Sequence, residues 1–105
     1  MTPTEFTQLV DTTLSQIEQA IEASDADIDF ETSAGILELE FANGSKIIIN
    51  RQSASQELWV AAKSGGYHYV WKDDAWRNTR DGSELFASLS RYVSEQAGQQ
   101  VEMKS

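Results

Sequence analysis

Residues 36–52 read ILELEFANGSKIIINRQ, and this stretch decides the fold of the chain. Between residues 37 and 41, apolar side chains alternate with glutamates, which is the period-two pattern of a strand with one buried face. Asn43-Gly44 follows, a pair that tolerates positive φ at both positions and is typical of a hairpin turn. The apolar run from Lys46 to Gln52 then provides the partner strand. The stretch therefore predicts an antiparallel hairpin.

Strand patterns continue on both sides of this hairpin, and a helix is predicted at each end of the chain. Thr2-Pro3-Thr4-Glu5 has the capping box and early proline of a helix start, and an apolar stripe with three- and four-residue steps runs from it to Ile21. Near the other end, Asp81 is expected to cap a second helix that Gly98 closes. Further strands are predicted over residues 27–31, 57–63, 67–72 and 76–79.

This order of elements predicts an α+β fold. We expect a two-layer sandwich in which the N- and C-terminal helices pack on one face of a five- to six-stranded antiparallel sheet. The other face of the sheet would then meet solvent. No linker or internal repeat is evident, so residues 1–105 are expected to form a single domain.

Composition excludes several classes of function. The chain has 105 residues, a formal net charge of −9 and no cysteine, so it offers no disulfide, thiolate metal site or thiol nucleophile. It has no signal-peptide pattern at its start and no apolar run of the length that crosses a membrane. We expect a cytoplasmic protein with no membrane partner.

Negative charge is concentrated in the first part of the chain. The first 45 residues carry ten carboxylates and no Lys, Arg or His, since the first cation is Lys46. A field of one sign attracts cations and basic protein surfaces and repels nucleic acid. Helical spacing places four of these acids on one stripe beside the apolar face: Asp11, Glu18, Glu22 and Asp25.

Three more acids, Asp27, Asp29 and Glu31, project from one side of the first predicted strand. If that strand lies at the sheet edge beside the helix, the helical and strand acids are expected to merge into one acidic ridge. Fe²⁺, Fe³⁺, Mn²⁺, Ca²⁺ or lanthanides would be attracted to these oxygen ligands, at shallow and weak sites. The alternative is a solvated acidic surface with no metal role.

Strand alternation also predicts which aromatic residues face outward. If Leu58, Val60 and Tyr69 point toward the helices, then Trp59 and His68 point to the open face. An outward Trp is either a rim residue half covered by its neighbours or an anchor for a partner protein.

An enzyme is not predicted. His68 is the only imidazole, and nothing in the sequence places a nucleophile and an orienting acid beside it. The paired acids are expected on a convex surface, where no cleft excludes water from a reaction.

Three motifs of the strand region stand out together: Asn50-Arg51-Gln52, Leu58-Trp59-Val60-Ala61 and Ser64-Gly65-Gly66-Tyr67-His68-Tyr69. In these motifs the chain resembles the frataxin family, and specifically its bacterial branch. The resemblance covers nearly the whole chain, including the Asn43-Gly44 hairpin, the acidic first helix and Asp81-Gly82 before the last helix. Ala54 and Glu57 depart from the usual Pro and Gln of the family.

This resemblance implies a regulator of iron–sulfur cluster assembly. It implies weak Fe²⁺ or Fe³⁺ binding on the acidic ridge and docking on the cysteine desulfurase and the scaffold protein, with no nucleic-acid partner. The expected state is a monomer, with iron-driven oligomers as a second state. The ridge is carried over to Glu18, Glu22, Asp25, Asp27, Asp29 and Glu31, and the partner surface includes Glu18, Glu22, Asp25, Asn50, Gln52, Trp59 and His68.

One alternative from a different class remains open at this point. An acidic protein-interaction or scaffolding module, including a mimic of DNA, would have the same charge without a physiological metal role. It would not require the outward Trp59 or the segment from Asn50 to Gln52.

Overall fold

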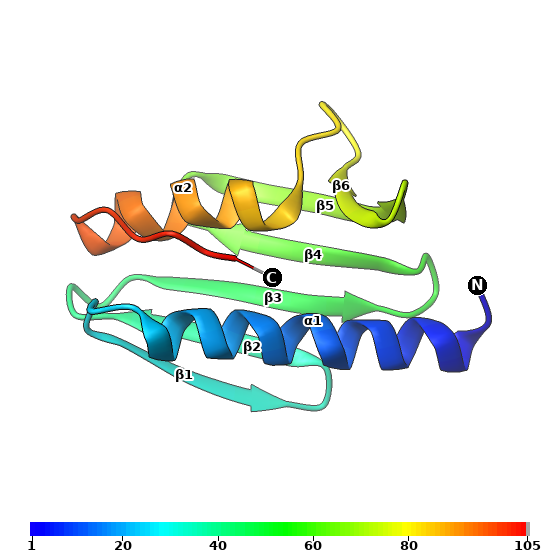
Figure 1. The fold of residues 1–105 in the computed structure, drawn as a ribbon, viewed down its shortest axis with the longest axis horizontal. Coiled ribbons are helices and arrows are strands. Elements are labelled where there is room, and N and C mark those ends of the chain that lie inside the picture. The colour runs from blue at the N-terminus through cyan, green and yellow to red at the C-terminus, as the bar shows by residue number, and fades with distance from the viewer. Residues whose placement is uncertain (105) are drawn as a thin grey trace.

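The computed structural model describes residues 1–104 and has two layers. Both helices lie on one face of a six-stranded antiparallel sheet (Figure 1). This arrangement confirms the predicted fold class. In chain order the elements are α1 (Pro3–Ala23), β1 (Ile28–Ser33), β2 (Ile36–Phe41), β3 (Lys46–Gln52), β4 (Glu57–Ala62), β5 (Gly65–Lys72), β6 (Ala75–Asn78) and α2 (Leu85–Ala97).

The sheet is a simple meander in which every strand pairs with its neighbours in the sequence, in the order β1-β2-β3-β4-β5-β6. Ala34 and Gly35 join β1 to β2, and their φ values of 50° and 80° are those of a tight hairpin whose twist matches the strands. The hairpin predicted at Asn43-Gly44 is present, but only Gly44 has a positive φ. Asn43 instead uses its side-chain oxygen to accept the N–H of Ser45 at 2.9 Å. Residues 42–45 form the turn, because β2 ends at Phe41 and β3 begins at Lys46.

The cap of α1 was predicted correctly from the sequence, whereas the cap of α2 was not. At α1 the capping box is complete: Thr2 accepts the N–H of Glu5, and Glu5 accepts the N–H of Thr2. At α2 the prediction that Asp81 is the cap is wrong, because Glu84 accepts the N–H groups of Phe86 and Ala87. Asp81 accepts bonds from Ser83, which lower the pKa of Asp81 and form the turn before the helix. Gly98 ends α2 in the left-handed conformation, as predicted.

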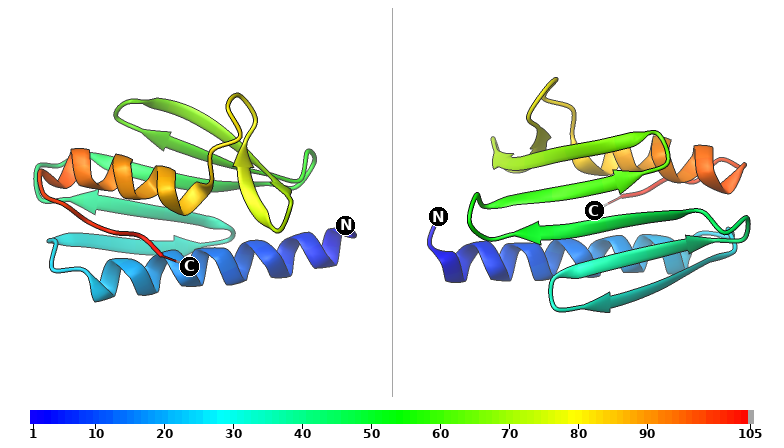
Figure 2. Two further views of the ribbon diagram at one scale, coloured as in Figure 1. Left: turned by 45° about the horizontal axis from the view of Figure 1, so that its top comes forward. Right: turned by 180° about the vertical axis from the view of Figure 1, so that it is seen from behind.

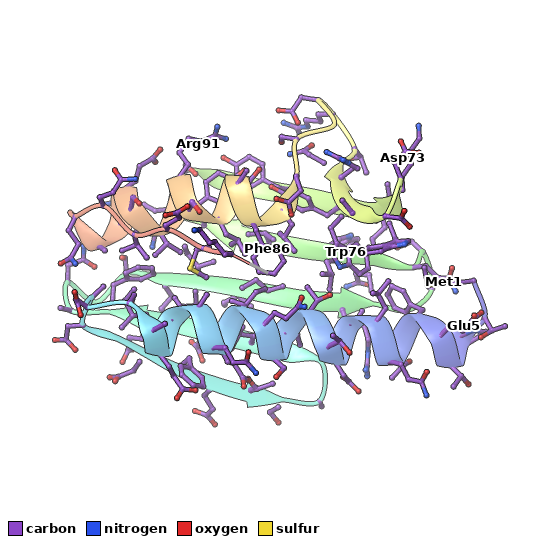
Figure 3. All side chains as sticks on the ribbon, in the orientation of Figure 1. Met1, Glu5, Asp73, Trp76, Phe86 and Arg91 are labelled. Atoms are coloured by element: carbon purple, nitrogen blue, oxygen red, sulfur yellow. The ribbon has the colours of Figure 1, made fainter. Side chains whose placement is uncertain are left out.

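The core lies between the helices and the inner face of the sheet. Alternate residues of β2 to β5 point into it, and the apolar stripes of both helices cover them. Trp76 of β6 is buried and donates its indole N–H to Thr13 Oγ1 of α1 at 2.9 Å. Figure 3 shows Trp76 and Phe86 in the space between the two helices. The fully buried members from helix and sheet include Val10, Ile17, Leu37, Leu39, Ile47, Ile49, Leu58, Leu85 and Leu89.

The C-terminal segment runs back from the end of α2 between the two helices, as Figures 1 and 2 show. Val101 and Met103 of this segment are buried and belong to the hydrophobic core. Two serines of α2 hold the segment by its main chain, Ser94 at Val101 and Ser90 at Met103. Among the described residues, neither helix is long and apolar enough to cross a membrane.

Gly35 and Gly44 form a matched pair for testing the β1–β2 turn. Both have positive φ, so alanine at either position costs about 1–2 kcal/mol of stability. A Cβ at Gly35 would also lie 2.8 Å from Arg51 Cζ, whereas nothing lies within 4 Å at Gly44. In urea unfolding we expect Gly35→Ala to lose about 1 kcal/mol more than Gly44→Ala, since Arg51 must leave its rotamer. Equal losses would contradict this account of the turn.

Candidate functional site

Three acids occupy one flank of α1, beside its buried stripe. At 100° per residue, Asp11, Glu18 and Glu22 fall within one narrow sector, and we call these three the helix row. The prediction that Asp25 joins them is wrong, because α1 ends at Ala23 and Ser24 is extended; the exposed Asp25 instead lines a pocket with the C-terminal segment. Glu18 is half-buried and its Oε2 accepts the hydroxyl of Thr32 on β1, whereas Asp11 and Glu22 are exposed. The helix row therefore lies on the side of α1 that faces the edge strand of the sheet.

A groove of about 460 Å³ separates the helix row from the β1–β2 hairpin. Asp11 and Glu18 line it from α1, and Arg51 lines it from the inner face of β3. The Arg51 side chain packs over Gly35, whose carbonyl accepts the Arg51 N–H at 2.9 Å. Within residues 1–104, Arg51 forms no ion pair with any carboxylate. Arg51 thus shares this groove with the helix row but forms an ion pair with none of its acids.

The strand acids lie on the opposite face of the sheet. Asp29 and Glu31 are exposed, while their alternating neighbours Ile28 and Phe30 pack against the core on the helix side. Asp27 is exposed just before β1. The expectation that both rows merge on one side is therefore corrected: they flank β1 on its two faces, because Thr32, and not an acid, points to α1.

Two further acids join the strand row, and sequence reasoning missed them. Pairing of β1 with β2 sets Asp29 opposite Glu40 and Glu31 opposite Glu38, so four carboxylates share one patch. We call these four the strand row. The tight turn at residues 34–35 fixes the register between β1 and β2, and recognising it would have predicted this pairing of acids. The turn was not predicted from the sequence because alanine is an unusual residue at a positive φ.

Lys46 is the cation nearest the strand row. Its ammonium lies 2.8 Å from Glu38 Oε1 and 3.8 Å from Glu40 Oε2. The hydrogen bond to Glu38 and the charges of Glu38 and Glu40 raise the pKa of Lys46. None of the seven acids predicted as metal ligands is in an ion pair among the described residues. Lys46 thus neutralises part of β2 and leaves β1 and α1 anionic.

These acids do not form a closed metal site. Within the part of the chain that the structure describes, no group of three or more His, Asp or Glu side chains is close enough to hold one metal ion. Each ion on this surface would meet one or two carboxylates, and water would complete its coordination. The geometry fits weak binding of hard cations at several positions.

The predicted partner residues of the sheet lie together on its outer face. Cross-strand pairing aligns Asn50, Trp59 and His68 in one row, and Gln52 lies on the same face opposite Glu57. The rings of Trp59 and His68 stack with centroids 4.5 Å apart and planes 7° from parallel. Trp59 is 37% exposed, so the outward orientation predicted by the alternation is observed.

Glu57 holds the Trp59 side chain by a hydrogen bond to its indole N–H. Its Oε1 accepts the indole N–H at 2.8 Å and the hydroxyl of Ser55 at 3.1 Å, and it lies 3.9 Å from His68 Nδ1. The indole is thus held in one orientation by a hydrogen bond on its edge and a ring on its face. This pre-organisation lowers the entropy that a binding partner would have to remove.

Exposed isoleucines extend this surface, and the sequence analysis did not include them. Ile36 and Ile48 are 43% and 36% exposed, and their alternation puts them on the outer face with Trp59. Ile48 and Trp59 line a hollow of about 230 Å³. Trp71, in contrast, faces the helix side at the rim, 36% exposed, with its ring edge-on to Trp76.

Comparison with known proteins points to one family. A sequence model described as a frataxin-like domain matches residues 1–99. The iron–sulfur cluster assembly protein CyaY of Paraburkholderia phymatum is 48% identical over 103 residues, which cover 98% of this chain and 98% of that protein. The protein with the same name in Dechloromonas aromatica is also 48% identical, over 99% of this chain and 100% of its own length.

Solved structures agree with the sequence comparison. The frataxin from Psychromonas ingrahamii superimposes with a TM-score of 0.93 at 36% identity, and the match covers 100% of both chains. The trimeric frataxin of Saccharomyces cerevisiae in its ferrous complex superimposes with a TM-score of 0.70 at 26% identity, over 90% of this chain and 87% of that one.

Proposed function

The chain belongs to the frataxin-like family, and from this premise we propose that it regulates iron–sulfur cluster assembly. In this proposal it works in the cytoplasm, binds iron weakly on its acidic surface and docks on the cysteine desulfurase and its scaffold protein. The observation that carries the proposal is the absence of any ion pair at the seven predicted acids among residues 1–104. A surface left anionic in this way favours cations and basic proteins.

Iron is proposed as a surface-bound ligand of the acidic rows. Fe²⁺ and Fe³⁺ accept carboxylate oxygens, and the seven candidate ligands offer nothing else. Among the described residues, no three His, Asp or Glu side chains are placed to hold one metal ion, so several weak sites fit this surface better than one strong site. Other divalent and trivalent cations are expected to bind there as surrogates. The proposed ligands are Asp11, Glu18, Glu22, Asp25, Asp27, Asp29 and Glu31.

Two surfaces are proposed to contact the assembly complex. The acidic rows steer a basic partner toward the edge of the sheet and raise the association rate. The outer face then supplies Trp59 as an anchor, because a held and partly exposed indole buries a large area at low entropic cost. Asn50, Gln52 and His68 surround that anchor on the same face.

Metal and partner are expected to influence each other. An iron bound to the helix row removes negative charge that a basic partner would otherwise meet, so each ligand changes the affinity for the other by the same factor. Regulation in this form requires no catalytic residue, and the protein is proposed to act on the rate of cluster formation by others. The same anionic surface disfavours nucleic acid.

The second candidate is an acidic interaction or scaffolding module with no physiological metal role. The surface charge would serve it equally well. The geometry of Trp59 favours the regulator, since a module that acts by charge alone has no use for an indole held by Glu57 and His68. The metal titration below separates the two.

Charge reversal at two proposed partner acids, Glu22 of the helix row and Asp25 just after α1, tests the docking proposal. Glu22 and Asp25 are exposed, and Glu22→Lys with Asp25→Lys removes no hydrogen bond that the described residues show. We expect affinity for the cysteine desulfurase, measured by calorimetry at low ionic strength, to fall at least about tenfold. The matched control is Asp73→Lys with Glu95→Lys, which makes the same change in net charge at two exposed positions where the described residues show no side-chain hydrogen bond or ion pair. Equal losses in both variants would show that only net charge matters.

A metal titration monitored by NMR tests the iron proposal. With Fe²⁺ added anaerobically, or Co²⁺ as a surrogate, we expect signals from residues 11–31, Glu38 and Glu40 to broaden first, because these carboxylates form the two acidic rows. Signals of α2 serve as the internal control. Broadening spread evenly over the chain, or none at millimolar metal, would favour the scaffolding module.

A further inference from the structure

The free side of β1 is an open strand edge. β1 is the first strand in the sheet order, and Figure 2, in its right-hand view, shows no other ribbon along its outer margin. α1 lies over the face of the sheet and reaches β1 through the contact between Glu18 and Thr32. An edge of this kind presents unpaired main-chain groups that another strand can bind.

The register shows which groups are unpaired. Phe41 donates its N–H to Ser45, and Gly35 accepts from Arg51, so odd-numbered residues of β2 bond toward β3. Even-numbered residues of β2 therefore bond to β1, where they pair with Asp29, Glu31 and Ser33. The N–H and C=O groups of Phe30 and Thr32 point away from the sheet, and the described residues show no hydrogen bond to them.

The opposite edge of the sheet is partly covered. The segment after β6 folds back along it, with a bridge between Arg77 and Glu84 and a hydrogen bond of 2.8 Å from the Asn78 N–H to the Ser83 carbonyl. β1 has no such cover. It contains neither a proline nor a positive φ within Ile28–Ser33. Charge is thus the barrier to strand pairing at β1.

The negative charge of β1 opposes pairing with an acidic strand but not with a basic one. Two copies of this edge would bring Asp29 and Glu31 against their own kind, which disfavours self-pairing. A cationic strand would meet the same acids as partners. We propose that β1 is a docking edge, to which an extended segment of a basic partner protein adds as a seventh strand. This inference rests on the proposed function in one respect, namely that the partner of the acidic surface is a basic protein.

The two faces of β1 specify the side chains of that segment. On the outer face, alternate residues would lie beside Asp29 and Glu31 and are expected to be Lys or Arg. On the helix side, the intervening residues would lie beside half-buried Ile28 and Phe30 and are expected to be apolar. The segment is therefore a basic–apolar–basic alternation of about six residues, the length of β1.

A blocked peptide of three Lys-Val repeats is the probe for this edge. We expect it to slow hydrogen exchange of the Phe30 and Thr32 amides, and to leave that of Glu31 unchanged because the Glu31 amide already bonds to β2. Thr32→Pro removes an outward donor and keeps every carboxylate, so the NMR-measured affinity should fall about fivefold or more. Thr32→Val keeps the donor and removes only the hydroxyl, so it should bind like the wild type.

Each outcome of this experiment decides a separate point. A peptide of the same composition in the order Lys-Lys-Lys-Val-Val-Val should bind at least fivefold more weakly, and equal binding would overturn the strand model. Unprotected amides at Phe30 and Thr32 would overturn it even if Thr32→Pro failed to fold. Equal losses in the Pro and Val variants would assign the effect to the hydroxyl and overturn it as well. If Thr32→Pro binds normally while the Glu22 and Asp25 reversals still weaken the desulfurase, the proposed function stands and only the added strand falls.

Discussion

The packing of α1 against the inner face of the sheet is the contact on which the rest of this structure depends. Val10 and Ile17 are fully buried there, together with Leu37, Leu39 and Ile47 of the strands. Burial of five such side chains contributes on the order of 10 kcal/mol, which far exceeds the few tenths of a kcal/mol that one exposed like-charge pair costs on a helix. The core can therefore hold the acidic rows in place although, among the described residues, only Lys46 pairs with any of their acids.

The sheet gives the protein two surfaces of different character. Its edge is anionic, with the helix row on one side of β1 and the strand row on the other. Its outer face is aromatic at the centre, where Glu57 and His68 hold Trp59. Both surfaces are built on one rigid framework, so a partner that is steered by the edge meets the indole in a fixed relation to it. Charge accelerates such an encounter, and the buried aromatic area stabilises the complex.

Most of the fold could be predicted from the sequence because its strands have a clear period of two and its first helix a complete capping box. The acidic flank of α1 followed from helical spacing in the same way for Asp11, Glu18 and Glu22, but not for Asp25, because the helix ends at Ala23. The arrangement of the strand acids did not, since the register of β1 depends on Ala34, a residue with little preference for the positive φ it adopts. Aspartate is a common helix cap, but Asp81 accepts the N–H of Ser83 in the preceding turn, and Glu84 caps α2 instead. The packing of Met103 depends on long-range contacts with no local pattern.

The claim that this surface is an uncompensated anionic field is tested most directly by the kinetics of association. The measurement is the rate constant for binding of this protein to the cysteine desulfurase, by stopped flow, as ionic strength rises from about 0.01 to 0.15 M, over which the Debye length falls from about 30 to 8 Å. The account predicts that the rate constant falls about tenfold or more, with a much smaller change in the dissociation rate. A rate constant that stays the same across this range would contradict it.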